Sequence, residues 1–374
     1  MSFEDSNEKE EYDFLPSEEN TIPEYRSFFI HSKHNAIEID AVDNLPSIDA
    51  AQYLNDTDLI KVDFSNTVTT INERAFCGCS RLKDIHFNNP LSEIGDLAFS
   101  YCTELSSISL PDSLLKIGSE AFAHCSSLLK IHIPFSVSEM GYRSFMDCRK
   151  LSRITVSKNN HYYDSRNDCN AIIETASNEL IQGCHSTVIP NSLKSIGYYA
   201  FAMCEGLKSI TIPNSVISIG RCSFVLCRNL SSICFSEQLE IIDYGAFGGC
   251  SSLTDISLPL SLRKIGALAF KQCTHLRTIV LPDGIKSIEL ELFAECELLS
   301  SVNIPNSVER IGMHAFYKCI SLKTIRIPSS VQNIDLWAFE GCTNLKEVFI
   351  PALYKSRIEI IFNDCVNLKH IVYT

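Results

Sequence analysis

The residues of this 374-residue chain with the clearest capacity for chemistry are its 17 cysteines. Thiolates act as nucleophiles, bind metals and form disulfides. Twelve of them stand three residues after a phenylalanine and three before a leucine. These twelve are Cys79, Cys102, Cys125, Cys148, Cys204, Cys227, Cys250, Cys273, Cys296, Cys319, Cys342 and Cys365. They form two runs with a constant 23-residue period, and a longer interval separates Cys148 from Cys204.

This period predicts that the twelve cysteines stack, one in each coil of a repeat. Stacked coils place equivalent Cα atoms about 5 Å apart, which a disulfide tolerates. Equivalent side chains nevertheless point the same way, so neither disulfide geometry nor a tetrahedral metal site is expected. We therefore expect the column to be a row of small buried hydrophobic side chains.

Five cysteines lie outside the column: Cys77, Cys169, Cys184, Cys222 and Cys234. Cys169 and Cys184 fall within the long interval, where a disulfide and a reduced pair are both open alternatives. Cys234 falls at an outward strand position and is the candidate for an exposed, reactive thiol.

Other catalytic chemistry has no support in the sequence. The ten histidines show no H-E-x-x-H spacing, and no phosphate-binding loop or G-x-S-x-G elbow occurs. We predict that the chain is not an enzyme and needs no cofactor or metal.

The elements that position the cysteines follow from the repeat I-G-x-x-A-F-x-x-C-x-x-L-x-x-I-x-I-P-x-S-V-x-x, which is cleanest from Ile311 to Val331. L-x-x-I-x-I alternates as a strand with one buried face does, and proline ends it. V-x-x-I is expected to form a short extended piece on the opposite wall. The following glycine suits either a positive φ or a close backbone approach. A-F-x-x-C is expected to form a tight turn that directs the phenylalanine inward.

One such unit cannot bury its apolar residues alone, but stacked units can. A 23-residue period lies within the range of leucine-rich repeats. The sequence thus predicts a β-rich or α/β solenoid with one parallel strand per coil and short extended or 3-10 pieces on the other wall.

The predicted organisation has three parts. Residues 1–26 hold nine acidic against two basic residues and are expected to be disordered. Residues 27–47 are expected to form a capping hairpin. Residues 48–374 form the solenoid, whose first coil has Asp56 in place of the cysteine. An enlarged coil with a hairpin-like excursion is expected at about 157–190.

The repeat loosens near its C-terminal end, where Arg357 occupies an isoleucine position. The final strand, Leu368–Tyr373, would present an unpaired edge. End-to-end self-association through this edge is one expectation.

The string from Ile304 to Ile325 resembles the BspA-like leucine-rich-repeat family, known also from a Treponema pallidum-type repeat. The segment from Tyr163 to Thr175 resembles the long variant repeat that interrupts such arrays. The resemblance covers about residues 48–374. It implies a right-handed solenoid that binds protein and supplies no catalytic residues. Members are often bacterial surface proteins or adhesins, and the repeats are abundant in some parasitic protists.

Charge and hydropathy limit the partners. A net charge of −13 disfavours nucleic acid, which needs a basic face. The chain contains no run of about 18 apolar residues, so membrane insertion is not expected. The N-terminal segment Met1–Tyr25 shows no secretory pattern, which favours an intracellular location, whereas the family favours the cell surface or secretion.

Partner binding is expected at outward strand positions on the concave sheet. One candidate cluster is basic and lies beside the enlarged coil, which adds aromatic anchors; the other combines charge with an exposed ring near the C-terminus. The first consists of Lys130, His132, Arg153, Thr155, His161, Tyr162 and Tyr163, and the second of Arg326, Glu347 and Phe349. The predicted function is a protein-interaction scaffold with an adhesin-like role. The alternative is an intracellular scaffold or regulatory adaptor, and an enzyme comes third.

Overall fold

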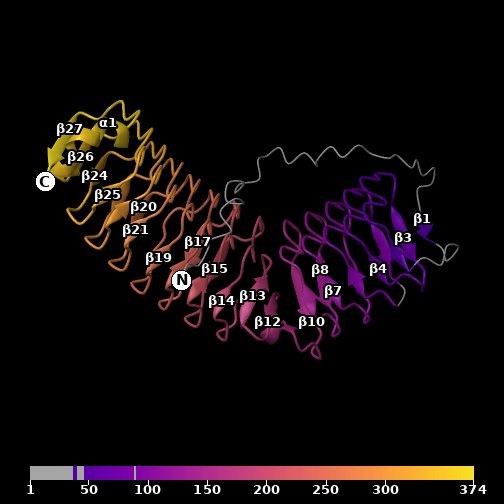
Figure 1. Cartoon of the computed structure of the whole chain (residues 1–374). Coiled ribbons are helices and arrows are strands. Elements are labelled where there is room, and N and C mark those ends of the chain that lie inside the picture. Colours follow the sequence, from indigo (N-terminus) through magenta and orange to yellow (C-terminus); the bar gives the residue numbers. More distant parts are fainter. Residues whose placement is uncertain (1–36, 40–45, 88–89) are drawn as a thin grey trace, which may run out of the picture. The chain divides into compact units, whose positions relative to one another are not determined.

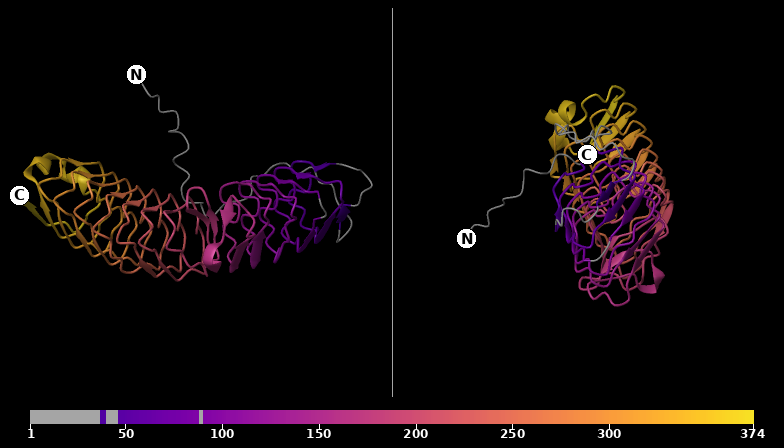
Figure 2. Two further views of the ribbon diagram at one scale, coloured as in Figure 1. Left: turned by 90° about the horizontal axis from the view of Figure 1, so that it is seen from below. Right: turned by 90° about the vertical axis from the view of Figure 1, so that its right-hand side faces the viewer.

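The computed structural model describes residues 37–39, 46–87 and 90–374, all within one compact unit, His34–Thr374. Most coils supply a strand to one ladder and a short strand to a second ladder (Figures 1 and 2), and two coils join the first ladder only by single bridges, at Ser107 and Asp255. This arrangement confirms the predicted solenoid of parallel strands. The predicted tail, 1–26, lies outside the described residues, and so does the predicted hairpin, 27–47, except for 37–39 and 46–47.

The face ladder is built by the L-x-x-I-x-I segments. Its strands are β1 (Ile37–Ile39), β3 (Lys61–Phe64), β5 (Asp84–His86), β8 (Lys130–Ile133), β10 (Arg153–Val156), β15 (Ser209–Thr211), β17 (Ser232–Cys234), β20 (Thr278–Val280), β22 (Ser301–Asn303), β24 (Thr324–Arg326), β26 (Glu347–Ile350) and β27 (His370–Tyr373). Neighbours pair in parallel, as β8 does with β10. In β5 the outer residues are exposed and Ile85 is buried, which is the predicted alternation.

The wall ladder is built by the V-x-x-I segments. Its regular strands are β2 (Ser47–Ile48), β4 (Thr70–Ile71), β6 (Glu93–Ile94), β7 (Lys116–Ile117), β9 (Glu139–Met140), β14 (Ser195–Ile196), β16 (Ser218–Ile219), β18 (Ile241–Ile242), β19 (Lys264–Ile265), β21 (Ser287–Ile288), β23 (Arg310–Ile311) and β25 (Asn333–Ile334). They also pair in parallel, one coil to the next. The buried isoleucines of this ladder close the core from the side opposite to the face ladder.

The repeated phenylalanines form the centre of the core. Within each run their rings stack with centroids 4.9–5.9 Å apart and planes 2–23° apart. That spacing is in the range of offset aromatic stacking. Tyr53 takes the ring position in the first coil, 5.0 Å from Phe76.

The cysteine column has a role beyond apolar packing. In eleven of the twelve coils the thiol donates to the backbone carbonyl 26 residues earlier, with Sγ–O distances of 3.0–3.4 Å. The oxygen of Phe247, for example, accepts from the Cys250 amide within its own coil and from the Cys273 thiol of the next coil. Cysteine therefore links coils with a donor that alanine lacks.

All 17 cysteines are free thiols in the structure, Cys169 and Cys184 included. Burial raises the pKa of the Cys125 and Cys273 thiols to about 12, so both remain protonated donors at neutral pH. Cys204 is the column member whose thiol makes no such bond, because the enlarged coil precedes it.

The thiol environments predict selective labelling. Cys234 is exposed, whereas fifteen cysteines are buried and Cys204 is half-buried. Iodoacetamide at pH 8 should therefore modify Cys234 first and the buried column only after denaturation, as read by peptide mass spectrometry. Cys234→Ser should remove the fast phase, and column thiols that react as quickly as Cys234 would contradict their burial.

The wall glycines serve close backbone approach, not a positive φ. A Cβ added to Gly118 would lie 2.5 Å from the Asp96 nitrogen in the preceding coil. The left-handed residues lie elsewhere in the turn, as at Glu120 (φ 54°) and His124 (φ 61°). The sequence left open whether these glycines serve a positive φ or a close backbone approach, and the structure supports the close approach.

The enlarged coil adds an antiparallel hairpin to the wall ladder. It contains β11 (Tyr163–Asp164), the 3-10 turn η1 (Arg166–Asp168), β12 (Ile172–Glu174) and β13 (Glu179–Gln182). β12 pairs antiparallel with β11 and β13, and β13 then pairs in parallel with β14. The buried core divides here into two clusters.

The last coil replaces its wall strand by η2 (Ala352–Arg357) and the helical turn α1 (Ile358–Ile361). Tyr354 is buried in this turn and donates its hydroxyl to the Val331 carbonyl, 3.1 Å away. β27 pairs with β26 on one side, and no other strand among the described residues pairs with it. End-to-end association stays a prediction.

Candidate functional site

Four residues of the basic cluster come together on the face ladder. Lys130 and His132 lie on β8, in register with Arg153 and Thr155 on β10. His132 Nδ1 and Thr155 Oγ1 are 2.9 Å apart. The two strands therefore present these side chains as one continuous group, here named the basic face.

The charge of the basic face is uncompensated. Lys130 and Arg153 are direct neighbours on adjacent strands, and both are exposed. Neither forms an ion pair with any residue that the structure describes. Adjacent like charges on a sheet are destabilising. An acidic partner would relieve this repulsion.

The aromatic anchors predicted beside this cluster need a correction. Tyr163 is buried, with 6 % exposure, and so cannot be a surface anchor. Its pairing in β11 with Glu174 turns it inward, where burial raises the pKa of its hydroxyl. His161 and Tyr162 are exposed, but they precede β11, which pairs with β12 and not with β10.

The C-terminal candidates are also neighbours. Arg326 on β24 is in register with Phe349 on β26, and its Cζ lies 3.5 Å from the ring centroid. Glu347 is flanked by Thr324 and His370 on the adjacent strands. The ring is half-buried because the guanidinium covers it, so this cluster offers less free charge than the basic face.

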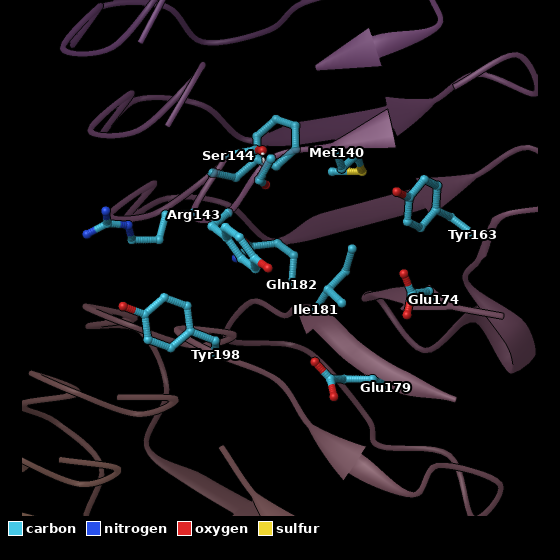
Figure 3. A pocket seen from close by; sticks show the side chains of 12 residues that line it. Met140, Arg143, Ser144, Tyr163, Glu174, Glu179, Ile181, Gln182 and Tyr198 are labelled. Atoms are coloured by element: carbon cyan, nitrogen blue, oxygen red, sulfur yellow. Dashed lines mark hydrogen bonds between the residues drawn. The ribbon is translucent and has the colours of Figure 1, made fainter. Parts of the chain in front are cut away.

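A pocket that the sequence did not reveal lies where the core divides (Figure 3). Its volume is about 230 Å³, and we name it the coil pocket. Its lining includes Met140, Tyr142, Arg143, Tyr163, Glu174, Glu179, Ile181, Gln182 and Tyr198. These residues come from β9 and the turn after it, from the hairpin, and from the turn after β14.

The pocket exists because the hairpin interrupts the phenylalanine stack. Gln182 and Gly183 stand near Phe201, and a Cβ on Gly183 would lie 2.2 Å from that ring. The Gln182 amide donates to the Gly183 and Ala200 carbonyls, which satisfies it inside the core. The end of the hairpin thus stands between Phe145 and Phe201, where a regular coil would place the next ring.

Tyrosines gather at the rim of the pocket. The rings of Tyr142 and Tyr198 meet edge to face at 5.9 Å, and Tyr198 also contacts Tyr199 at 4.2 Å. The Arg143 guanidinium lies 5.1 Å from the Tyr199 ring centroid and forms an ion pair of 2.8 Å with Glu120. Figure 3 shows this guanidinium directed away from the pocket.

The sequence carried a partial signal for the pocket. Tyr142 and Tyr198 occupy the same repeat position, three residues before the phenylalanine. The long interval separates them in the chain, however, and only the folded hairpin brings the two coils together.

The described residues also bear on two other classes of function. No group of three or more His, Cys, Asp or Glu side chains is arranged to hold a metal ion. Over the same residues, no helix is long and apolar enough to cross a membrane.

The strands are parallel and follow the 23-residue period, and the regular coils each carry a leucine, a cysteine and a stacked phenylalanine. These features define a leucine-rich-repeat solenoid. The family model for the BspA type leucine rich repeat region matches residues 46–169, 177–300 and 286–374. The chain belongs to this family, which confirms the resemblance inferred from the repeat. The matches omit 170–176, the part of the hairpin that contains β12.

Solved structures give the same fold. A leucine-rich repeat protein from Eubacterium ventriosum is 24 % identical with a TM-score of 0.63, covering 82 % of each chain. One from Bacteroides ovatus is 26 % identical with a TM-score of 0.55, covering 90 % of this chain and 92 % of that one. The pneumococcal vaccine antigen PcpA is 20 % identical with a TM-score of 0.56, covering 84 % and 80 %. A comparison with curated proteins gives no match.

The family implies a scaffold that binds protein, and scaffolds of this type are generally not enzymes. The regular residues build the core and vary little between coils. Recognition must therefore depend on surface residues that differ between coils.

Proposed function

We propose that this chain binds a protein partner through its face ladder, centred on the basic face. The observation that carries the proposal is the register of Lys130 with Arg153, which sets two unpaired positive charges side by side. Complementary charges across an interface contribute to specificity and association rate. The expected partner surface is acidic.

Two settings are compatible with such binding: an adhesin-like role outside the cell, and a scaffold or adaptor role inside it. The free thiols favour the second, because oxidising compartments promote disulfides. Titration of the natively purified protein with a thiol reagent tests this preference. Paired thiols in most positions would overturn it.

Charge reversal tests the binding face. In a pull-down, Lys130→Glu/Arg153→Glu should lose the partners of the wild-type chain, because an acidic surface is then repelled. Arg263→Glu/Lys264→Glu is the matched control, since it makes the same charge change at exposed positions in and beside wall strand β19. An identical partner set for the basic-face variant and the wild type would remove this face from consideration.

A further inference from the structure

The coil pocket combines two features that favour a cation. Glu174 on β12 and Glu179 on β13 are direct partners in the antiparallel pair, so two carboxylates lie on one side of the pocket. Figure 3 shows both below Tyr163, on the side opposite to Arg143. Tyrosine rings from two coils complete the lining, and aromatic faces attract cations.

The negative charge of the pocket is not neutralised within the described residues. Glu174 accepts from the Ser177 hydroxyl and Glu179 from the Ser195 hydroxyl, at 2.5 and 2.9 Å, but neither carboxylate forms an ion pair. Arg143 lines the pocket but pairs with Glu120 and covers Tyr199. Facing like charges destabilise a strand pair, and a bound cation would offset that cost.

The size of the pocket limits the ligand. Sites for drug-sized molecules usually measure about 300–1,000 Å³. A volume of about 230 Å³ is smaller, and it suits one long side chain. The exposed ring of Tyr142 at the rim, 71 % accessible, offers further contact area to a larger body outside the pocket.

We propose that the coil pocket binds the lysine or arginine side chain of a partner protein, with Glu174 and Glu179 holding its charge and the tyrosines contacting its stem. This inference rests on the proposed function only in taking a protein as the partner. Its site lies on the wall ladder and not on β8 or β10. The two proposals can therefore fail separately.

The test uses the full chain and short probes in ligand-detected NMR at low ionic strength. A blocked pentapeptide, acetyl-Gly-Gly-Lys-Gly-Gly-amide, should bind in the millimolar range, and its norleucine analogue should bind at least about tenfold more weakly because it lacks the charge. Higher salt should weaken lysine binding. Equal binding of both peptides, preference for a glutamate analogue, or binding of methylammonium but not of the lysine peptide would overturn the proposal.

Variants locate the site. Glu174→Gln/Glu179→Gln should lower the affinity for the lysine peptide at least about tenfold, while keeping side-chain volume. Glu237→Gln/Glu297→Gln is the matched control, with the same charge change at exposed positions elsewhere. Tyr142→Leu provides a second test at an exposed rim position that does not support the core. Unchanged affinity in both pocket variants would overturn the assignment, and circular dichroism checks that each variant is folded.

Discussion

Titration of the reduced protein from pH 8 to pH 12 should unfold it, with a midpoint between about pH 9 and pH 9.5. The cause is the cysteine column. Burial raises the pKa of eleven of its twelve thiols, with Cys125 and Cys273 reaching about 12. In the unfolded chain a cysteine has a pKa of about 8.5.

The direction in which stability changes with pH follows from proton linkage. A thiol whose pKa is raised by folding contributes stability that is fully present below the unfolded value and is lost as pH rises toward the folded value. At pH 10 the contribution of each such thiol to the free energy of unfolding has fallen by about 2 kcal/mol, at about 1.4 kcal/mol per pH unit. Eleven thiols together lose more than the roughly 5–15 kcal/mol by which domains are normally stable.

Two optical signals recorded together check this expectation. Thiolate absorbance near 240 nm and circular dichroism should change in one transition, because the thiols ionise only when the coils open. Cys250→Ser/Cys273→Ser should move the transition to higher pH, since serine keeps a donor but does not ionise. Thiolate formation by most of the 17 cysteines near pH 8.5 with unchanged circular dichroism would contradict the buried column.

Phe247→Ala should be among the most destabilising single substitutions in the chain. The ring is fully buried and stacks on Phe224 and Phe270 at 5.1 and 5.6 Å, with Phe235 edge-on at 5.7 Å. Removing a buried phenylalanine costs about 3–5 kcal/mol, and each lost aromatic pair adds about 0.5–1.5 kcal/mol.

Urea denaturation measures this cost, and Phe135→Ala is its control. Phe135 is 48 % exposed and contributes little to the core, so the same chemical change should cost less than about 1 kcal/mol. Because coils contact only their neighbours, hydrogen exchange in Phe247→Ala should accelerate mainly in adjacent coils. Equal losses in both variants would contradict the stacked-ring core.

The period alone predicted the coils, because each repeated residue has the same neighbours in every coil. Leu82 and Ile85 could be assigned to the interior from their spacing, and the structure buries both. Lys130 and Arg153 could likewise be assigned to one surface, since a 23-residue offset is also the register of adjacent strands.

Three features could not be predicted, because they depend on contacts that the spacing of residues does not determine. The thiol-to-carbonyl bonds join residues 26 apart and require the turn geometry, so the column was predicted only as apolar. Tyr163 was misplaced because the antiparallel pairing of the hairpin, not the repeat, sets its direction. The coil pocket arises from that same hairpin, where the period is interrupted.

The most direct test of the binding account is the rate of amine labelling of the chain with and without a protein retained in the pull-down. Lys130 on the face ladder should be protected in the complex, and Lys264 on the wall ladder should react at an unchanged rate. Protection of Lys264 with no change at Lys130 would contradict binding through the basic face.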